Sequence, residues 1–514
     1  MTIPRLFTVL ISLGIVSASE LSSQSNAVPE LPDYGRTITI RHLVHHTSGL
    51  RDQWAILGLA GWRFGEELIT ERDVLRVISR QRSLDFEPGT EWSYSNTGYT
   101  LLAVIAKRIT GKTLREFTAE RIFGPLGMHR THFHDDHAMI VKGRTAAYVP
   151  WSASRTSLPM GMLDTPYDDL VAAAPTLLEP ADQPSGEKYR IGMPIFDVVG
   201  ATSLFTTVED LFRWDQSLYS GRVGGELGVR QMLERGILSS GDTLDYAFGL
   251  RKGDHKGLTS WRHSGSDVGF QTDYLRIPEE RFGVAVLCNN RVAPAPFADQ
   301  VADIILANRI RRLARARRDV ETRGPSNPIS LSEGELSAKA GFYRGTNNGD
   351  LLRVEFAKGK LVLAGRELIP LGSDRFQFGP EPRRGVYIFE SGPDGIFIRR
   401  PQPNRAGGSS PDLRYRAVPA ASPTSAELEK YAGEYWSEEL DVGYSFVVEN
   451  GKLVLRRTKF EDDPLEPTIV DGFAATRSLL ATRFEFTRDA PGEIVGFAAY
   501  AGRARAITFA RRRQ

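Results

Sequence analysis

The C-terminal part of the chain carries the same sequence pattern twice. Three landmarks recur in the same order: Ala-Gly-x-Tyr at 340–343 and 432–435, Gly-Lys-Leu-Val-Leu at 359–363 and 451–455, and Arg-Phe-x-Phe at 375–378 and 483–486. The second landmark begins eighteen residues after the glycine of the first in both copies. A duplicated pattern indicates two units of one fold, so this repeat constrains the architecture more than any other feature.

Both copies have the composition of small β modules. Polar and apolar residues alternate along short stretches, as they do in half-buried strands, and Gly, Asp and Asn separate the stretches. We predict two homologous all-β modules, small barrels or curved sheets, at 331–420 and 424–514. Neither copy shows a catalytic constellation. An Arg-rich run that ends a helix and then gives way to Gly and Pro places a linker at 311–330.

The region ahead of the linker mixes helical and strand patterns. Apolar residues recur at helical spacing over 101–109, and Gly111 can close that helix. Thr207 precedes an acidic first turn, which predicts a helix start. The stretches 274–277 and 282–287 predict a hairpin of two strands. Helices combined with antiparallel strands predict an α/β (α+β) domain.

Composition gives no reason to expect nucleic acid as a partner. The formal net charge is +2 over 514 residues, and 41% hydrophobic with 25% charged residues is an ordinary globular balance. Cys288 is the single cysteine, so no intrachain disulfide can form. Its apolar setting predicts a small buried hydrophobic residue rather than a nucleophile.

Residues 1–27 have the features of a signal peptide. Arg5 is followed by the apolar stretch 6–16 and by Ser17-Ala18-Ser19, a small-residue cleavage candidate. The stretch is too short for a membrane span, and no other segment is long and apolar enough for one. A genuine signal peptide would place the protein in the periplasm or outside the cell. The alternative is a spurious start of the gene.

Two clusters ahead of the linker carry residues suited to chemistry. Tyr94 and Asn96, two positions apart, can place a phenol and an amide on one side of a cleft, and the phenol can move a proton if nearby cations lower its pKa. After His263, Gly265 allows close approach to the backbone, and the Ser266 N–H can donate to an oxyanion. Taken singly, the tyrosine and the histidine are more often ordinary core residues.

The order of the motifs resembles a known family. His-Thr-Ser-Gly-Leu at 46–50, Tyr-Ser-Asn at 94–96 and His-Ser-Gly at 263–265 are similar to motifs of the β-lactamase-related serine hydrolases, of the class C β-lactamase and D-Ala-D-Ala-peptidase type (the S12 peptidase group). The resemblance covers roughly residues 28 to 305 and implies a β-lactamase/transpeptidase-like domain, which we place at 28–310. The two β modules resemble the lipocalin-like C-terminal domains of some members.

The resemblance implies a role for each matching residue. Tyr94 would be the general base or proton shuttle, and Asn96 would bind the substrate amide. His263 would stand where the family often has lysine, holding a substrate carboxylate and tuning the tyrosine. The Ser266 N–H, beside Gly265, would form half of the oxyanion hole. The implied substrates are small peptides, esters or β-lactam-like compounds, with no cofactor. Histidine is a weaker fixed cation than lysine at neutral pH, which favours esters or peptides.

The chain departs from the family at its nucleophile. The family's reactive serine belongs to Ser-x-x-Lys, ahead of the first motif, and no lysine precedes Lys107 here. Loss of such a nucleophile typically costs about 10⁶-fold in turnover. The match stops abruptly before residue 28, which favours a truncated or frame-shifted gene over a pseudoenzyme. The chain is then a hydrolase that is inactive as given; the alternative is a non-catalytic binding protein for cell-wall peptides or a protein partner.

A histidine-rich stretch invites a zinc interpretation. It contains close-spaced imidazoles and carboxylates: His129, His132, His134, Asp135, Asp136 and His137. The stretch follows the loop-like segment 123–128, so we expect structural or surface use and no metal.

Overall fold

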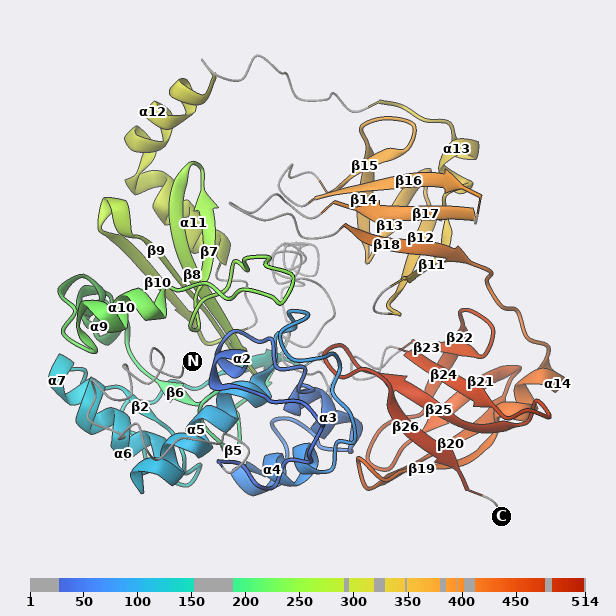
Figure 1. Cartoon of the computed structure of the whole chain (residues 1–514), viewed down its shortest axis with the longest axis horizontal. Helices are drawn as coiled ribbons and strands as arrows, with labels where there is room; N and C mark the ends of the chain where they lie inside the picture. Colours follow the sequence, from blue (N-terminus) through green and yellow to red (C-terminus); the bar gives the residue numbers. More distant parts are fainter. Residues whose placement is uncertain are drawn as a thin grey trace.

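The computed structural model describes residues 27–151, 188–290, 295–318, 329–346, 349–379, 385–393, 395–401, 412–476 and 483–512. It has three parts, which we call the first domain (α2 to α12), barrel 1 (β11 to β18) and barrel 2 (β19 to β26) (Figure 1). The first domain contains helices and a four-stranded antiparallel sheet, and the two barrels are closed, eight-stranded and antiparallel. This is the predicted fold class. Residues 1–26 and 319–328, parts of the predicted signal peptide and linker, lie outside the described residues.

The sheet of the first domain positions the candidate site. Its strand order is β10-β9-β8-β7, with β7 at Arg251–His255, β8 at Leu258–Asp267, β9 at Phe270–Ile277 and β10 at Phe282–Cys288. The predicted hairpin is β9 and β10, with Ile277 opposite Phe282 and the one-turn 3-10 helix η4 (Pro278–Glu280) between them.

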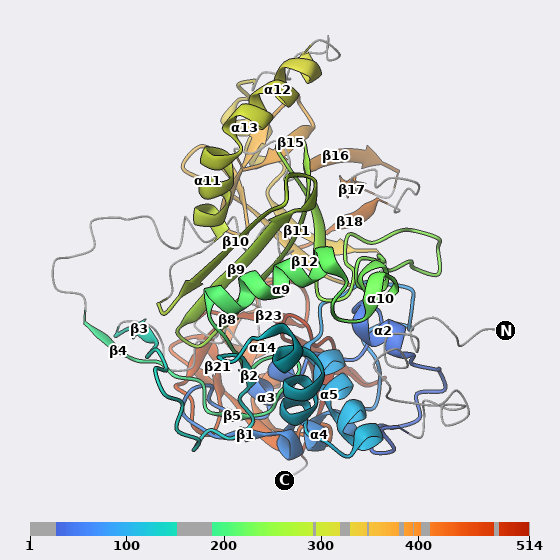
Figure 2. The same ribbon diagram turned by 90° about the vertical axis from the view of Figure 1, so that its left-hand side faces the viewer.

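Two helices cover opposite faces of this sheet. On one face, Tyr274 and Arg276 of β9 contact Asp215 of α9 (Val208–Ser220), which crosses the sheet in Figure 2. The alternate residues Leu275 and Ile277 form an apolar cluster with small residues of α11 (Ala295–Ile305). Because successive side chains of β9 point to opposite faces of the sheet, this one strand packs against α9 on one face and against α11 on the other.

The remaining helices of the first domain are short, apart from α5. They are α2 (Ile40–Val44), α3 (Gln53–Leu59), α4 (Glu71–Ser79), α5 (Asn96–Thr110), α6 (Leu114–Thr118), the π-helix η2 (Ala119–Phe123), α7 (Gly124–Leu126), α10 (Gly225–Met232) and α12 (Ala307–Arg318). Gly111 ends α5 in the left-handed conformation, and Thr207 caps α9 by accepting from the Asp210 N–H, so both helix predictions are confirmed. Helix α12 contains residue 310, the predicted end of the domain.

The described part of the first domain also contains three short strand pairs. They are β1 (Ile69–Thr70) with β5 (Phe196–Asp197), β2 (His132–Phe133) with β6 (Leu204–Phe205), and β3 (Tyr148–Pro150) with β4 (Tyr189–Ile191). Cys288, predicted to be buried, is only half-buried at the end of β10. In the described part of the chain, no helix is both long and apolar enough to cross a membrane.

The repeat folds into two barrels of the same design. Barrel 1 consists of β11 (Gly341–Gly345), β12 (Leu351–Ala357), β13 (Lys360–Leu363), β14 (Arg366–Pro370), β15 (Arg375–Phe378), β16 (Val386–Gly392), β17 (Gly395–Arg400) and β18 (Leu413–Val418). Barrel 2 consists of β19 (Gly433–Ser437), β20 (Val442–Glu449), β21 (Lys452–Arg456), β22 (Asp463–Pro467), β23 (Gly472–Ala475), β24 (Arg483–Arg488), β25 (Ile494–Tyr500) and β26 (Ile507–Arg511).

The tyrosine contacts match in the two barrels, whereas the Arg-Phe-x-Phe motifs lie on the fifth strand of barrel 1 (β15) and on the sixth strand of barrel 2 (β24). A capped helix precedes each barrel, α13 (Glu333–Ser337) and α14 (Ser425–Leu428), and the 3-10 helix η6 (Glu429–Tyr431) follows the latter. The tyrosine of each Ala-Gly-x-Tyr motif, Tyr343 or Tyr435, is buried and donates its hydroxyl to the carbonyl four residues earlier at 2.8 Å. The repeated motif therefore gives both barrels the same tyrosine hydrogen bond to the segment that precedes the first strand.

Candidate functional site

The first motif is a loop whose backbone only certain residues tolerate. His46 has φ +58°, and Gly49 has φ +72° with its Cα so close to the Phe86 carbonyl that a Cβ would lie 2.0 Å from that oxygen. Glycine is therefore required at position 49. The strained histidine is fixed by two bonds: its carbonyl accepts from the Ser93 N–H at 3.0 Å, and its Nδ1 accepts from the Ser95 N–H at 3.1 Å.

Four aromatic side chains converge where the predicted motifs meet, and we call them the ring cluster: His46, Tyr94, Tyr246 and His263. The centroid of the His46 ring lies 4.2 Å from that of Tyr94 and 4.7 Å from that of Tyr246. The His263 ring lies 6.1 Å from both tyrosine rings. The structure thus brings the first and third motifs and the tyrosine loop together, although His46 and His263 are far apart in sequence.

Both histidines of the ring cluster are neutral at pH 7. Burial lowers the pKa of His263 to about 4, and the nearby Arg251 adds to this effect. Its Nδ1 lies 2.7 Å from the Ser264 carbonyl and its Nε2 lies 3.1 Å from the Tyr246 hydroxyl. Burial likewise lowers the pKa of His46 well below its usual range. His263 therefore does not provide the positive charge that the resemblance implied for it.

Tyr94 is a protonated phenol in this environment. Burial raises its pKa, which outweighs the lowering effect of Arg503 and Arg251. In the described part of the chain, its hydroxyl has no hydrogen-bond partner. A phenol in this state can donate a hydrogen bond to a ligand, whereas service as a general base would require a ligand or group that lowers its pKa.

Asn96 is held by a carboxylate. Its backbone N–H and its Nδ2 both donate to the Oδ2 atom of Asp52, at 2.7 and 2.6 Å. The Oδ1 atom of Asp52 accepts from the Trp54 N–H at the start of α3. One Nδ2 hydrogen and the amide oxygen of Asn96 remain, so the oriented side chain can donate to a substrate carbonyl or accept from a substrate N–H.

Gly265 and Ser266 lie on an open stretch of β8. Strand β7 pairs with β8 only as far as Arg251 opposite Arg262, whereas β9 continues to pair up to Asp267. Among the described residues no strand pairs with the other edge of residues 263–267, and this free edge lies beside the ring cluster, where an extended ligand can add backbone hydrogen bonds. A Cβ at Gly265 would lie 2.5 Å from Thr272 Oγ1, so packing against β9 requires this glycine.

Arginines supply the positive charge that the sequence analysis assigned to His263. The guanidinium of Arg503 lies 4.6 Å from the centroid of the Tyr94 ring, and that of Arg251 lies 5.1 Å from the Trp92 ring. Neither residue belongs to a motif, and Arg503 comes from barrel 2. No local signal in the sequence could have placed it there.

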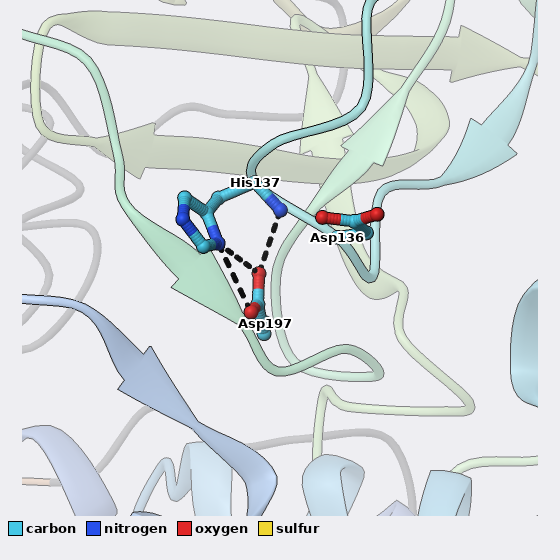
Figure 3. Close-up of side chains that lie close together, drawn as sticks. All are labelled: Asp136, His137 and Asp197. Carbon is cyan, nitrogen blue, oxygen red and sulfur yellow. Dashed lines mark hydrogen bonds and ion pairs between the residues drawn. The ribbon is translucent and has the colours of Figure 1, made fainter.

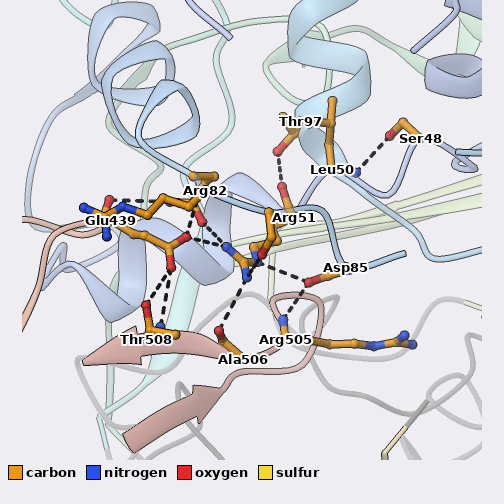
Figure 4. Close-up of polar contacts among 12 residues, drawn as sticks. Ser48, Leu50, Arg51, Arg82, Asp85, Thr97, Glu439, Arg505, Ala506 and Thr508 are labelled. Carbon is orange, nitrogen blue, oxygen red and sulfur yellow. Dashed lines mark hydrogen bonds and ion pairs between the residues drawn. The ribbon is translucent and has the colours of Figure 1, made fainter. Parts of the chain in front are cut away.

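A buried ionic network attaches barrel 2 to the site loops (Figure 4). The Arg51 guanidinium, which follows the first motif, donates to Glu439 at 2.6 Å and to Asp85 at 3.3 Å, and all three side chains are at most 3% exposed. The same Asp85 oxygen accepts from the Arg505 N–H at 2.9 Å. The Arg51 carbonyl accepts from Thr97 Oγ1 at the start of α5, so one residue connects barrel 2 to the Tyr94 loop.

The histidine-rich stretch forms one group that could coordinate a cation. The His137 Nδ1 lies 3.0 Å from both carboxylate oxygens of Asp197, whose Oδ1 also accepts from the His137 N–H, and Asp136 is adjacent (Figure 3). Asp136 and His137 are exposed. His134 instead stacks on Phe205 with ring centroids 4.3 Å apart, a packing role.

The chain belongs to the β-lactamase family. Residues 15–308, more than half of the chain, match the family described as Beta-lactamase. The ring cluster and the free edge of β8 lie within this match.

Curated relatives include peptidases and a penicillin-binding protein. Penicillin-binding protein 4* of Bacillus subtilis is 29% identical over 269 residues, which cover 51% of this chain and 53% of that protein. A D-aminopeptidase of Gluconobacter oxydans is 26% identical over 260 residues, covering 51% of this chain and 43% of the relative. The chain thus spans about half the length of these relatives. A D-aminopeptidase of Cereibacter sphaeroides is 24% identical over 420 residues, covering 80% and 67%.

Solved structures to which the chain shows similarity include a penicillin-binding protein homologue from Pyrococcus abyssi. It has a TM-score of 0.44 and 18% identity, and the match covers 89% of this chain and 86% of that one. The D-amino acid amidase of Ochrobactrum anthropi, solved with L-phenylalanine amide, has a TM-score of 0.40 and 18% identity, covering 61% and 80%.

Proposed function

We propose that the chain binds small peptides, amides, esters or β-lactam-like compounds along the free edge of β8, beside the ring cluster, and holds them without forming an acyl intermediate. The observation that carries the proposal is the convergence of Tyr94 and His263 on residues 263–267 of β8, which pair with β9 on one edge and, among the described residues, with no strand on the other. That edge offers backbone groups for an extended ligand, and the free phenol offers a donor. Relatives named D-aminopeptidase and D-amino acid amidase support this ligand class.

The absence of covalent chemistry in this chain is proposed from its residues. No Ser-x-x-Lys precedes the first motif in the sequence. Among the described residues, Ser95 Oγ is buried with no partner, and Ser266 Oγ accepts from Gln271. Neither hydroxyl contacts a general base, which a serine nucleophile requires. Turnover by acyl transfer to water, the activity of the family, would therefore need a group that these residues do not supply.

Two measurements on the full chain test the proposal. We expect D-phenylalanine amide to raise the melting temperature of the wild type in a concentration-dependent way, because a ligand that binds only the folded state stabilises it. Tyr94→Ala should reduce that shift, and Tyr148→Phe, an exposed tyrosine on β3, serves as the matched control.

The second measurement is intact-mass analysis after incubation with a fluorophosphonate and with a labelled penicillin. The proposal predicts an unchanged mass. A stoichiometric adduct on this chain would overturn the non-covalent part, and the absence of any ligand-dependent thermal shift would overturn the binding part.

A further inference from the structure

Barrel 2 extends a turn into the candidate site. This turn, residues 501–506 between β25 and β26, bonds directly to loops of the first domain. The Arg503 carbonyl accepts from the Asp52 N–H at 2.9 Å, and Asp52 in turn holds Asn96. The Arg503 guanidinium lies over the Tyr94 ring. A residue 409 positions after Tyr94 thus becomes part of the site.

The turn is held in one conformation. Ala501 and Ala504 exchange two backbone hydrogen bonds, at 3.0 and 3.1 Å, and both are at most 2% exposed. Arg505 bonds to Asp85 through its N–H and to Glu91 through its guanidinium at 3.1 Å. Arg503 is therefore presented to the site by a rigid support, and little conformational entropy is lost when it contacts a ligand.

The charge of Arg503 is not neutralised by a carboxylate in the part of the chain that the structure describes. Asp52, whose N–H donates to the Arg503 carbonyl, accepts with its two oxygens from the N–H groups of Trp54 and Asn96 and from the Asn96 amide. The guanidinium instead rests on the face of Tyr94, an interaction that is worth less than a paired carboxylate.

The guanidinium group of Arg251 adds to the positive potential that Arg503 produces at the ring cluster. Arg503 and Arg251 both lower the pKa of Tyr94 and of His46, which shows that the positive potential of the two arginines reaches the ring cluster. His263 is neutral at pH 7 and adds nothing to it. The positive potential of Arg503 at the ring cluster favours an anionic ligand group there.

We infer that Arg503 is a specificity-determining residue, by which barrel 2 makes the site prefer ligands with a carboxylate over the corresponding neutral amides. The inference rests on the proposed function, because it concerns ligands of the same site. A guanidinium binds a carboxylate through two parallel N–H donors, so it can leave the Tyr94 face for a ligand carboxylate without movement of the turn.

The test compares N-acetyl-D-phenylalanine with N-acetyl-D-phenylalanine amide by isothermal titration calorimetry on the full chain at low salt. The wild type should bind the acid at least about tenfold more tightly than the amide, the range of one charge-assisted contact. Arg503→Gln should abolish this ratio by weakening acid binding at least about tenfold more than amide binding. Arg503→Lys should retain part of it. Arg512→Gln removes a barrel 2 arginine that stacks on Trp436 outside the site and should change neither ligand.

The outcomes separate the inference from the proposed function. If the wild type binds both compounds and Arg503→Gln leaves the ratio unchanged, the inference is wrong and the binding site stands. If the wild type binds neither compound, the proposed function fails and the inference with it. An unchanged melting temperature of Arg503→Gln, measured beside Arg512→Gln, ensures that any loss of acid binding reflects the site rather than folding.

Discussion

The two barrels come from one repeated sequence, yet they stand in different relations to the first domain. The apolar core of barrel 1 is a cluster of its own. The core of barrel 2 is continuous with that of the first domain, so that Tyr444 and Phe509 belong to the same cluster as Trp54 and Leu101. The Tyr444 hydroxyl, although inside barrel 2, donates to the Leu59 carbonyl of α3 at 2.7 Å. Barrel 2 is thus part of the domain that carries the site.

The difference arises both at loop positions and on a barrel strand. Glu439 and the buried Leu440 form the dock of barrel 2. With the offset of 92 residues between the two Ala-Gly-x-Tyr motifs, the matching positions in the first copy are Asn347 and Asn348. An amide cannot replace the carboxylate that neutralises Arg51. On the strand, Tyr444 of β20 corresponds to Leu352, which has no hydroxyl to donate. The two copies therefore share a fold and differ at residues that contact the first domain.

The largest expected effect comes from removing one core phenylalanine from each barrel. Phe389 and Phe497 make edge-to-face contacts with Tyr343 and Tyr435, at centroid distances of 5.9 and 5.2 Å. Replacing either by Ala should cost about 3–5 kcal/mol of unfolding free energy. We expect Phe497→Ala to lower the stability of the first domain as well, and Phe389→Ala to affect barrel 1 alone, in calorimetric scans of the full chain. Equal effects of both on the first domain would contradict the comparison.

The next effect concerns the buried ion pair. Glu439→Gln leaves the Arg51 charge without its 2.6 Å partner and should cost about 3 kcal/mol, because a buried charge that loses its partner is not resolvated. Glu390→Gln in barrel 1 breaks a pair with Arg399 in which both side chains are about one-third exposed, and should cost under about 1 kcal/mol. Urea titration measures both. A cost of Glu439→Gln no larger than that of the control would show that the dock contributes little.

Lowering the pH should reduce the stability of the first domain more than that of barrel 1. All nine histidines precede residue 264, so neither barrel contains one. Burial lowers the pKa of His45 to about 4, so its contribution to stability is complete above its unfolded pKa of about 6.5 and is lost as pH falls toward 4. At pH 5 the loss is about 2 kcal/mol. Unfolding measured at pH 7 and 5 should show it in the first domain, and His45→Leu should reduce it. An equal loss in barrel 1 would contradict this assignment.

The smallest effect should be equal in the two barrels. Tyr343→Phe and Tyr435→Phe each remove one hydroxyl that donates at 2.8 Å to a carbonyl at the barrel end. We expect each to cost about 1 kcal/mol, the usual value for one hydrogen bond. Urea titrations of the two variants check this value. Clearly unequal costs would show that docking has altered the shared barrel design as well as its loops.

Sequence reasoning succeeded where local pattern determines structure. Strand alternation and the repeat indicated the barrels, and Gly111 and Thr207 marked helix ends, because each depends on neighbouring residues. It failed where the structure depends on distant partners. Arg51 and Glu439 lie 388 positions apart, and no periodicity relates them. The neutral state of His263 follows from its burial near Arg251, and the role of Asn96 from Asp52, neither of which a motif encodes.

The central claim is that barrel 2 and the first domain form one unit, with the ligand site at their junction. Native-state hydrogen exchange of the full chain tests it directly. Amides of α3, β20 and β13 are followed in increasing denaturant, in the wild type and in Glu439→Gln. We predict that α3 and β20 open with the same free energy and lose the same amount in the variant, while β13 is unaffected. If β20 follows β13, or if the variant loosens β20 and leaves α3 unchanged, the claim is wrong.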